Sequence, residues 1–307
     1  MANWPQCHSF VWRSMVPDPG CCKSPGSVLL QTLPFAGVEN YCFMIKNDHR
    51  IVPLRFFNHL NQYGNILHFV SSREGGVSPG IYHSLNLSYT AGDDTDNVTE
   101  NRKRLAEELD ITPAHLIFPG QSHSANIRVI KDFEEVNERI TETDALITEI
   151  HEVCISVLVA DCVPLLFYDP DNQVVAAAHA GWRGTVQSIA VKVVEEMKRT
   201  FGSDPSAILA GIGPSIGPDS YEVGENVVQE VTRNIHLDEK KVLLYPTGGK
   251  AHLDLWAANR MQLEYAGLDP LHIEEARIDT YQAHERFFSA RRLGNPCGRF
   301  AAGIMIR

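Results

Sequence analysis

The sequence predicts a mixed α/β (α+β) fold, and three observations carry this prediction. Residues 154–161 (CISVLVAD) and 173–181 (QVVAAAHAG) are apolar along both faces, as strands covered on both sides are. Residues 186–201 repeat apolar side chains at the spacing of an amphipathic helix. Strands and helices alternate along the chain without a long internal repeat, which is typical of α/β and α+β proteins.

The other elements follow in chain order. We expect a strand at 66–71, a glycine-rich turn at 75–80, and a helix at 97–109 capped by Asp96 or Asn97. Short strands are expected at 115–120, 126–130 and 144–149, and a further strand at 207–213 leads into a Gly/Pro loop. Gly202 ends the helix that begins near 186. Helices near 224–235 and 254–266 and strands at 277–281 and 300–307 complete the prediction.

Composition and charge exclude several classes of protein. The chain has 307 residues and a formal net charge of −11, with no dense Lys/Arg block, so a nucleic-acid partner is not expected. A membrane span is not expected either, because no apolar run reaches about 18 residues. The first residues lack the pattern of a secretory signal, which favours a cytoplasmic location. In that compartment the seven cysteines are expected to be thiols or metal ligands.

The chain divides into two parts of different character. Residues 1–50 carry Pro, Gly and Cys without a clear period, so we interpret them as a loose N-terminal extension. Residues 51–307 carry the periodic segments and are expected to form a single domain. The oligomeric state is not predicted by the sequence.

Cys162 and His179 each lie near the end of an apolar strand, where a rigid sheet can hold a side chain in a crevice. Three interpretations stay open from the residues alone. In the first, Cys162 is a small buried side chain and His179 is a core histidine whose hydrogen bonds are made within the protein. In the second, the two form a thiolate–imidazole pair for nucleophilic catalysis. In the third, both bind a metal ion, which requires a third ligand. His123, in the polar loop GQSHSAN, is the best candidate for that ligand.

A series of motifs from about residue 52 to the C-terminus changes the balance between these interpretations. In order they are SREGGVSPGIYHSLNL, GDDTDNVTENR, GQSHSANI, DALIT, VLVADCVPLLFYDP, AAHAGWRGT, GIGPSIGPDSYEVG and FFSARR followed by GRFAAGI. Together they resemble the YfiH/PgeF family, also called the laccase-domain or polyphenol-oxidase family. The spacing of ADC and HAGWRGT is highly specific for it.

The resemblance implies a single domain with a layered α/β/β/α arrangement and a metal centre, usually zinc, held by a His–Cys–His set. The matching positions here are His123, Cys162 and His179. Two departures are visible: Asp219 and Ser220 stand where family members often have cysteines, and QSHS replaces a frequent QVHG. Both departures leave the three ligands in place.

The resemblance also implies an enzyme of purine nucleosides. Its reactions would be phosphorolysis of adenosine, inosine, guanosine and methylthioadenosine, and deamination of adenosine, with nucleosides and phosphate as partners. The metal would activate a water for attack at the purine or polarise the base or sugar. An alternative is peptidoglycan editing, in which a serine-containing cell-wall precursor is hydrolysed by zinc or by a Cys162–His179 dyad. A third possibility is a metal-stabilised binding protein without activity.

Further candidate site residues are Arg73, beside two glycines, and Asn86 in SLNL. Arg73 is expected to help hold phosphate, and Asn86 and Cys162 complete the predicted catalytic residues. Asp161 is either a general base or a residue that orients the neighbouring Cys162. Zinc is favoured over copper, because laccases bind copper through many His-x-His pairs and this sequence has none.

Overall fold

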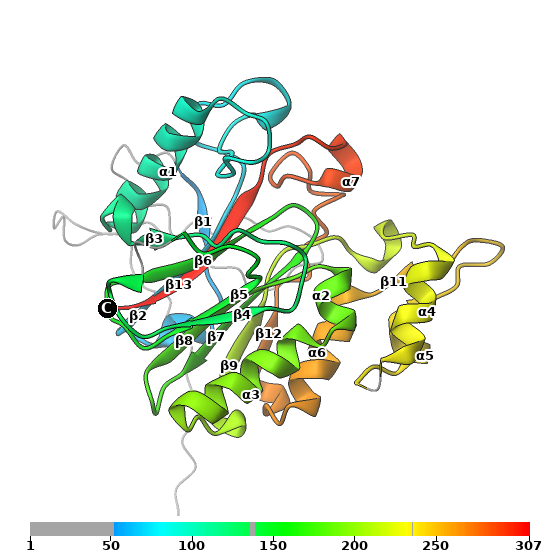
Figure 1. Ribbon diagram of the computed structural model, residues 1–307. Helices are drawn as coiled ribbons and strands as arrows, with labels where there is room; N and C mark the ends of the chain where they lie inside the picture. Colours follow the sequence, from blue (N-terminus) through cyan, green and yellow to red (C-terminus); the bar gives the residue numbers. More distant parts are fainter. Residues whose placement is uncertain (1–51, 136–138, 235) are drawn as a thin grey trace, which may run out of the picture.

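The computed structural model describes residues 52–135, 139–234 and 236–307. It consists of two β-sheets packed face to face, with helices on the outer side of each (Figure 1). The predicted extension, residues 1–50, lies outside the described residues. Within the described parts of the chain, no helix is long and apolar enough to cross a membrane.

The first sheet has five strands in the order β1-β2-β13-β6-β3. Their bounds are Leu54–Arg55 (β1), Ile66–Ser71 (β2), Phe300–Ile306 (β13), Cys154–Val159 (β6) and Leu116–Ile117 (β3). The C-terminal strand β13 lies in the middle, antiparallel to both β2 and β6, and β3 runs parallel to β6 (Figure 1). The last strand of the chain therefore joins β2 to β6.

The second sheet has six strands in the order β12-β9-β7-β8-β5-β4. Their bounds are Ile273–Glu275 (β12), Leu209–Ile212 (β9), Val163–Asp169 (β7), Val174–Ala180 (β8), Ala145–Thr148 (β5) and Ile127–Ile130 (β4). Strands β7 and β8 form an antiparallel hairpin at its centre, while β12 and β4 lie parallel to their neighbours at the edges. A separate two-stranded sheet joins Leu243–Leu244 (β10) to His252–Leu253 (β11).

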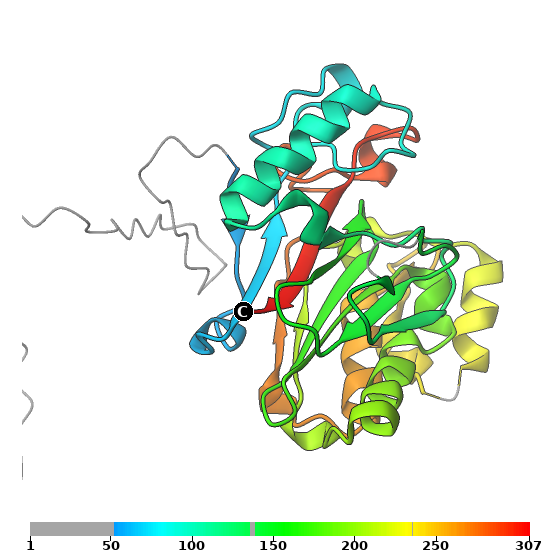
Figure 2. The same ribbon diagram turned by 60° about the vertical axis from the view of Figure 1, so that its left-hand side comes forward.

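Seven helices occur in the described residues. They are Thr95–Leu109 (α1), Trp182–Val186 (α2), Ile189–Phe201 (α3), Glu225–Arg233 (α4), Glu239–Val242 (α5), Leu255–Tyr265 (α6) and Ala290–Leu293 (α7). Helix α1 covers the outer face of the five-stranded sheet, and α3 and α6 cover the outer face of the six-stranded sheet (Figure 2).

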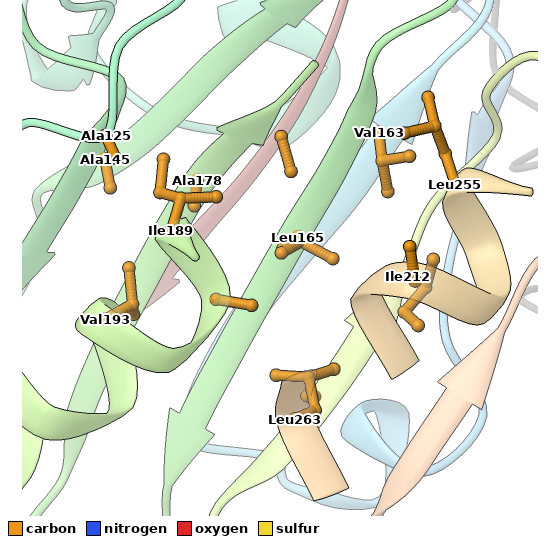
Figure 3. Packing of buried hydrophobic residues seen from close by; sticks show 14 of the residues in the cluster. Ala125, Ala145, Val163, Leu165, Ala178, Ile189, Val193, Ile212, Leu255 and Leu263 are labelled. Carbon is orange, nitrogen blue, oxygen red and sulfur yellow. The ribbon is translucent and has the colours of Figure 1, made fainter. Parts of the chain in front are cut away.

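Three hydrophobic layers follow from this arrangement, and they confirm the predicted α/β/β/α architecture. Leu105 and Leu109 of α1 pack on Phe69 and Met305 of the first sheet. Side chains of both sheets fill the layer between them, and a third cluster joins the second sheet to α3 and α6. Figure 3 shows this third layer, with residues of the sheet and of the two helices turned toward one another: Leu165, Ala178 and Ile212 from the strands, and Ile189, Val193, Leu255 and Leu263 from the helices.

Strand β8 shows why the apolar run at residues 173–181 has no polar face: both of its faces are covered. Val174, Ala176 and Ala178 point toward the helices, whereas Val175 and Ala177 point toward the other sheet. Because side chains alternate along a strand, His179 shares the face of Val175 and Ala177. The histidine is therefore directed into the space between the two sheets.

Several predicted boundaries differ from the structure. Helix α1 begins two residues early, because Asp94 rather than Asp96 or Asn97 is its cap and accepts a hydrogen bond from the amide of Asp96. The helix predicted from 186 is interrupted at Ser188, whose positive φ of 62° separates α2 from α3. Gly202 ends α3 as predicted.

The strand predicted at 277–281 is wrong. Its place in the sheet is taken by β12 at Ile273–Glu275, which pairs with β9. Arg277 has a positive φ of 47°, which leaves the extended conformation just after β12. Only Asp279 of the predicted segment pairs further, through an isolated bridge to Ser215.

Candidate metal centre

Three side chains from different segments converge where the two sheets meet at one end of the molecule. His123 comes from the loop between β3 and β4, Cys162 from the turn between β6 and β7, and His179 from the end of β8. Their ligand atoms all lie within 4.8 Å of one another, and no other group of this kind occurs in the described residues. The structure thus brings together the three residues that the sequence predicts as metal ligands.

The topology explains how Cys162 and His179 meet. Strand β6 belongs to the first sheet and β7 to the second, so Cys162 lies where the chain crosses between sheets. Residues 163 and 164 then pair with residues 180 and 179 across the β7–β8 hairpin. This register places the start of β7 beside the end of β8, and the two side chains come together at the same edge.

Without a metal ion, the charges of the triad favour a thiolate at Cys162 and an imidazolium at His179. Burial alone would raise the pKa of the Cys162 thiol, but the imidazoles of His179 and His123 outweigh burial and lower this pKa to about 6. Burial alone would lower the pKa of His179, but Cys162 and the hydrogen bond to Asp144 raise it to about 9. A bound zinc ion would displace the proton of His179, and the thiolate and two neutral imidazoles that result are an ordinary zinc donor set.

Asp144 fixes two of the three side chains. This carboxylate is fully buried, and its Oδ1 accepts hydrogen bonds from Nδ1 of His179 at 2.8 Å and from the amide of His123 at 3.0 Å. Its Oδ2 accepts from the amides and hydroxyls of Ser122 and Ser124. An imidazole held at Nδ1 by a carboxylate presents its Nε2 to a metal ion in a fixed orientation.

The same contacts explain the sequence QSHS. Both serines bind Asp144, so the loop folds around the carboxylate and turns His123 outward. His123 itself has a positive φ of 59°, and its ring lies 4.9 Å from the ring of His179 at nearly a right angle. Asp144 was not among the predicted site residues. The sequence signals for it are its position directly before the apolar strand ALIT and its place in the DALIT motif.

Gly181 and Gly184 are required by close packing at the site. A Cβ on Gly181 would lie 2.9 Å from Sγ of Cys162 and 3.5 Å from the ring of His123. A Cβ on Gly184 would lie 3.1 Å from the carbonyl oxygen of Ser124. The two glycines of HAGWRG therefore allow the helix that follows β8 to begin directly against the triad.

Asp161 links the turn before β7 to Thr280 and to helix α7 through hydrogen bonds. Its Oδ1 accepts a hydrogen bond from the Thr280 hydroxyl and its Oδ2 from the Arg291 amide, each at 2.7 Å. Burial raises the pKa of this carboxyl group. With both oxygens engaged, the geometry favours the orienting role for Asp161 over that of a general base.

A cavity of about 810 Å³ opens over the triad. This volume falls within the range of small-molecule sites, roughly 300–1,000 Å³. Aromatic and cationic side chains form much of its wall, together with the triad and Asp161: Tyr89, Phe118, Tyr221, Arg102, Arg139, Arg291 and Arg299. Sequence reasoning missed all seven, because they come from segments far apart in the chain.

Arg73 and Asn86 lie outside the residues that line this cavity. The Arg73 guanidinium donates hydrogen bonds to the carbonyl oxygens of His83 and His284 and stacks on the Phe288 ring at 4.5 Å. Its role in holding phosphate stays a prediction, and this geometry shows it anchoring two loops.

Asn86 is fully buried and holds residues of the cavity wall in place. Its Oδ1 accepts hydrogen bonds from the amides of Ser88 and Arg299, and its Nδ2 donates to the Ser88 carbonyl oxygen and to Asp93. Its predicted catalytic role stays a prediction, and its contacts reach the cavity through Ser88 and Arg299.

Comparisons with known proteins find relatives that align with most of this chain. A purine nucleoside phosphorylase of Bacteroides thetaiotaomicron is 41% identical over 256 residues, covering 81% of this chain and 95% of that protein. Adenosine deaminase RL5, from an unknown prokaryotic organism, is 41% identical over 230 residues, covering 73% of this chain and 87% of that protein. These alignments therefore include most of the described domain.

Solved structures show the same fold. YlmD from Geobacillus stearothermophilus matches with a TM-score of 0.78 and 31% identity, over 86% of this chain and 99% of that one. A YfiH protein of Bacillus licheniformis matches with a TM-score of 0.79 and 31% identity, over 85% and 98%. The family model described as multi-copper polyphenol oxidoreductase laccase matches residues 67–307. The chain therefore belongs to this laccase-domain family, the YfiH/PgeF family that its motifs indicate.

Proposed function

We propose that this chain is a zinc-dependent purine nucleoside enzyme that catalyses phosphorolysis and, in parallel, deaminates adenosine. The relatives named as purine nucleoside phosphorylases and as an adenosine deaminase support an enzyme acting on purine nucleosides. The observation that carries the proposal is the triad of His123, Cys162 and His179 beneath a cavity of nucleoside size. Adenosine, inosine, guanosine and methylthioadenosine are the proposed substrates.

Zinc fits the residues present. One thiolate and two imidazoles are ordinary zinc ligands, and three protein ligands leave a fourth position open. When bound there, zinc would supply a Lewis acid that activates water or polarises the substrate. Copper chemistry of the laccase type needs several copper sites, whereas the described residues hold a single group of metal-binding character.

The chain's own residues would bind and orient the substrate. Tyr89, Phe118 and Tyr221 place aromatic faces around the cavity, and such faces suit a planar purine. Burial raises the pKa of the Tyr221 phenol, which keeps its proton available for donation. Arginines on the wall would hold phosphate close to the ribose.

Two reactions follow from this arrangement. In phosphorolysis, a phosphate oxygen bonds to C1′ of the ribose while the bond from C1′ to the purine nitrogen breaks, and the purine leaves with that electron pair and takes up a proton. In deamination, the oxygen of water bonds to C6 of adenosine and ammonia leaves. The cationic wall of the cavity serves the first reaction, since only the first reaction uses an anion.

The test combines metal analysis with product analysis of the purified full chain. Wild-type protein is expected to carry about one zinc per chain, and His123→Ala, Cys162→Ala and His179→Ala are each expected to lose it. Cys154→Ala is the matched control, because Cys154 is a buried thiol on β6 outside the triad.

Adenosine with phosphate should yield adenine and ribose-1-phosphate, with some inosine, while adenosine without phosphate should yield inosine alone. The triad variants should lose both products, and Cys154→Ala should keep them. Turnover of a serine-containing cell-wall precursor with nucleosides untouched would overturn the proposal. So would full metal occupancy in the triad variants.

A further inference from the structure

The cavity over the triad carries a positive charge that the rest of the chain does not. The whole chain has a formal net charge of −11, yet four arginines line this cavity: Arg102, Arg139, Arg291 and Arg299. Asp161 is the one carboxylate among the lining residues, and both of its oxygens already accept hydrogen bonds. The cavity wall is therefore suited to an anion.

Arg102 is held rigidly at this wall. Its Nε donates a hydrogen bond to the Leu87 carbonyl oxygen at 2.9 Å. The central carbon of its guanidinium lies over the rings of Tyr89 and Phe118, at 4.3 Å from each ring centroid. Burial lowers the pKa of Arg102 to about 10, which still leaves it charged at neutral pH. Nothing in the described part of the chain accepts a hydrogen bond from its two terminal nitrogens.

Arg299 is held at the cavity wall by Asn86 and Leu87. Its amide donates to Oδ1 of Asn86 at 2.9 Å, and its carbonyl oxygen accepts from the Leu87 amide at 3.0 Å. One terminal nitrogen, Nη1, donates to the carbonyl oxygens of Cys297 and Gly298. Its Nε and Nη2 have no acceptor among the described residues.

The two arginines thus share one anchor, the segment 86–88. Leu87 binds Arg102 through its carbonyl oxygen and Arg299 through its amide, and the fully buried Asn86 binds Arg299 directly. Ser88, the next residue, lines the cavity with both of them. Although they are far apart in the chain, the side chain of Arg102 and the backbone of Arg299 are therefore anchored on one segment, and both residues line the same cavity.

We propose that Arg102 and Arg299 form a subsite for a phosphate-type oxyanion in the cavity over the triad. Arginine donates parallel hydrogen bonds to phosphate oxygens, and two fixed guanidinium groups can bind one phosphate together. This proposal rests on the proposed function, since phosphorolysis requires a phosphate near the ribose. It assigns phosphate to this pair in place of Arg73, whose guanidinium is already engaged with two carbonyl oxygens.

The decisive variants are Arg299→Gln and Arg102→Gln, measured in the full chain. Arg292→Gln is the matched control, because Arg292 is an exposed arginine of α7 that stacks on Tyr281 and does not line the cavity. Binding of inorganic phosphate is measured by calorimetry, with chloride at equal ionic strength as reference. Because Arg102 is packed against two rings, Arg299→Gln alone carries the test if Arg102→Gln does not fold.

In the decisive variants the affinity for phosphate should fall at least tenfold. The KM for phosphate should rise by at least the same factor. Formation of inosine without phosphate should fall less than the formation of adenine with phosphate in these variants, and Arg292→Gln should match wild type throughout. Retention of phosphate affinity in Arg299→Gln and Arg102→Gln, with its loss in Arg73→Gln, would overturn the subsite.

Two further outcomes separate the subsite from the proposed function and from the source of the anion. Phosphate binding that depends on Arg299 without any nucleoside turnover would support the subsite and refute phosphorolysis. Adenosine 5′-monophosphate that binds through Arg299, when free phosphate does not, would support the subsite and assign the anion to the substrate itself. Wild-type protein that binds neither phosphate nor the monophosphate would overturn the proposal.

Discussion

Asp144→Asn tests whether the buried carboxylate behind the triad sets its affinity for metal. The substitution keeps the shape of the side chain but replaces one oxygen with an amide group that donates. If the amide takes the place of Oδ1, the bonds from His123 and His179 are lost. If it takes the place of Oδ2, the bonds from Ser122 and Ser124 are lost instead.

The expected magnitude follows from this count. At least two charge-assisted hydrogen bonds are lost in either orientation, and each contributes at least about 1.5 kcal/mol, so the free energy of unfolding should fall by roughly 3 kcal/mol. Loss of the carboxylate that orients a ligating histidine weakens metal binding by about 10- to 100-fold. Both effects are expected in the same variant.

The assay pairs urea unfolding with zinc competition against a chelator of known affinity. Asp169→Asn is the matched control, since Asp169 is also fully buried and accepts three hydrogen bonds, from the amides of Asp171 and Asn172 and the Asn172 side chain. It lies at the other end of β7 from Cys162. The control should lose stability, by about 1.5 kcal/mol or more for the lost bonds, and keep its zinc affinity within twofold. Unchanged zinc affinity in Asp144→Asn would refute the reasoning.

Three further predictions concern the glycine beside the triad, a buried histidine and the cavity wall. Gly181→Ala should weaken zinc binding at least tenfold, because its Cβ would lie 2.9 Å from Sγ of Cys162, while Gly64→Ala, with open space around it, should not; metal analysis decides between them. His68 has a pKa of about 4 in the folded chain, lowered from 6.5 chiefly by burial, so the unfolded state binds the proton more readily. The contribution of the neutral His68 to stability is therefore present above pH 6.5 and is lost as pH falls toward 4, by about 3.5 kcal/mol at roughly 1.4 kcal/mol per pH unit. Urea unfolding across this range should show a loss of stability that His68→Gln reduces, and equal pH dependence in the two proteins would contradict the prediction. Tyr221→Phe should raise the KM for nucleosides about fivefold at unchanged zinc content, the cost of one hydrogen bond; an unchanged KM would remove Tyr221 from the substrate site.

Much of the fold could be predicted because local patterns identify elements whose faces are unambiguous. Helix α3 and strands β6 and β8 follow directly from their apolar periodicity, and Gly202 marks a helix end through its positive φ of 75°. The predicted strand at 277–281 failed because a short edge strand is specified by its partner. Ile273 pairs with Ala210 of β9, and no local pattern distinguishes it from the residues after it.

The order of the strands could not be predicted from the sequence either, because it depends on pairing between distant segments. Strand β13 lies between β2 and β6 through pairs that join residues more than 140 positions apart, such as Gly303 with Phe69 and Ser156. A pairing of this kind depends on which faces the helices cover, and that is decided only in the assembled protein.

The candidate site divides in the same way. His123, Cys162 and His179 could be named as candidates because each is a chemically distinctive residue at a strand end or in a polar loop, and the resemblance of the motifs then favoured metal binding. Asp144 could not be named from the residues alone, because a single aspartate before a strand is usually an ordinary turn residue. Its function is visible only when its hydrogen bonds to His123 and His179 are seen together.

The proposed metal ligands and the proposed phosphate-binding arginines come from different layers of the molecule. Cys162 directly precedes β7 and His179 lies near the end of β8, both strands of the six-stranded sheet, whereas Arg102 comes from α1 and Arg299 directly precedes β13 on the side of the five-stranded sheet. The two groups meet only at the cavity between the layers. Changes at the arginines should therefore alter phosphate binding without altering zinc content, and changes at Asp144 should do the reverse. This separation suits the proposed pair of reactions, because deamination would use the metal side alone and phosphorolysis would use both sides.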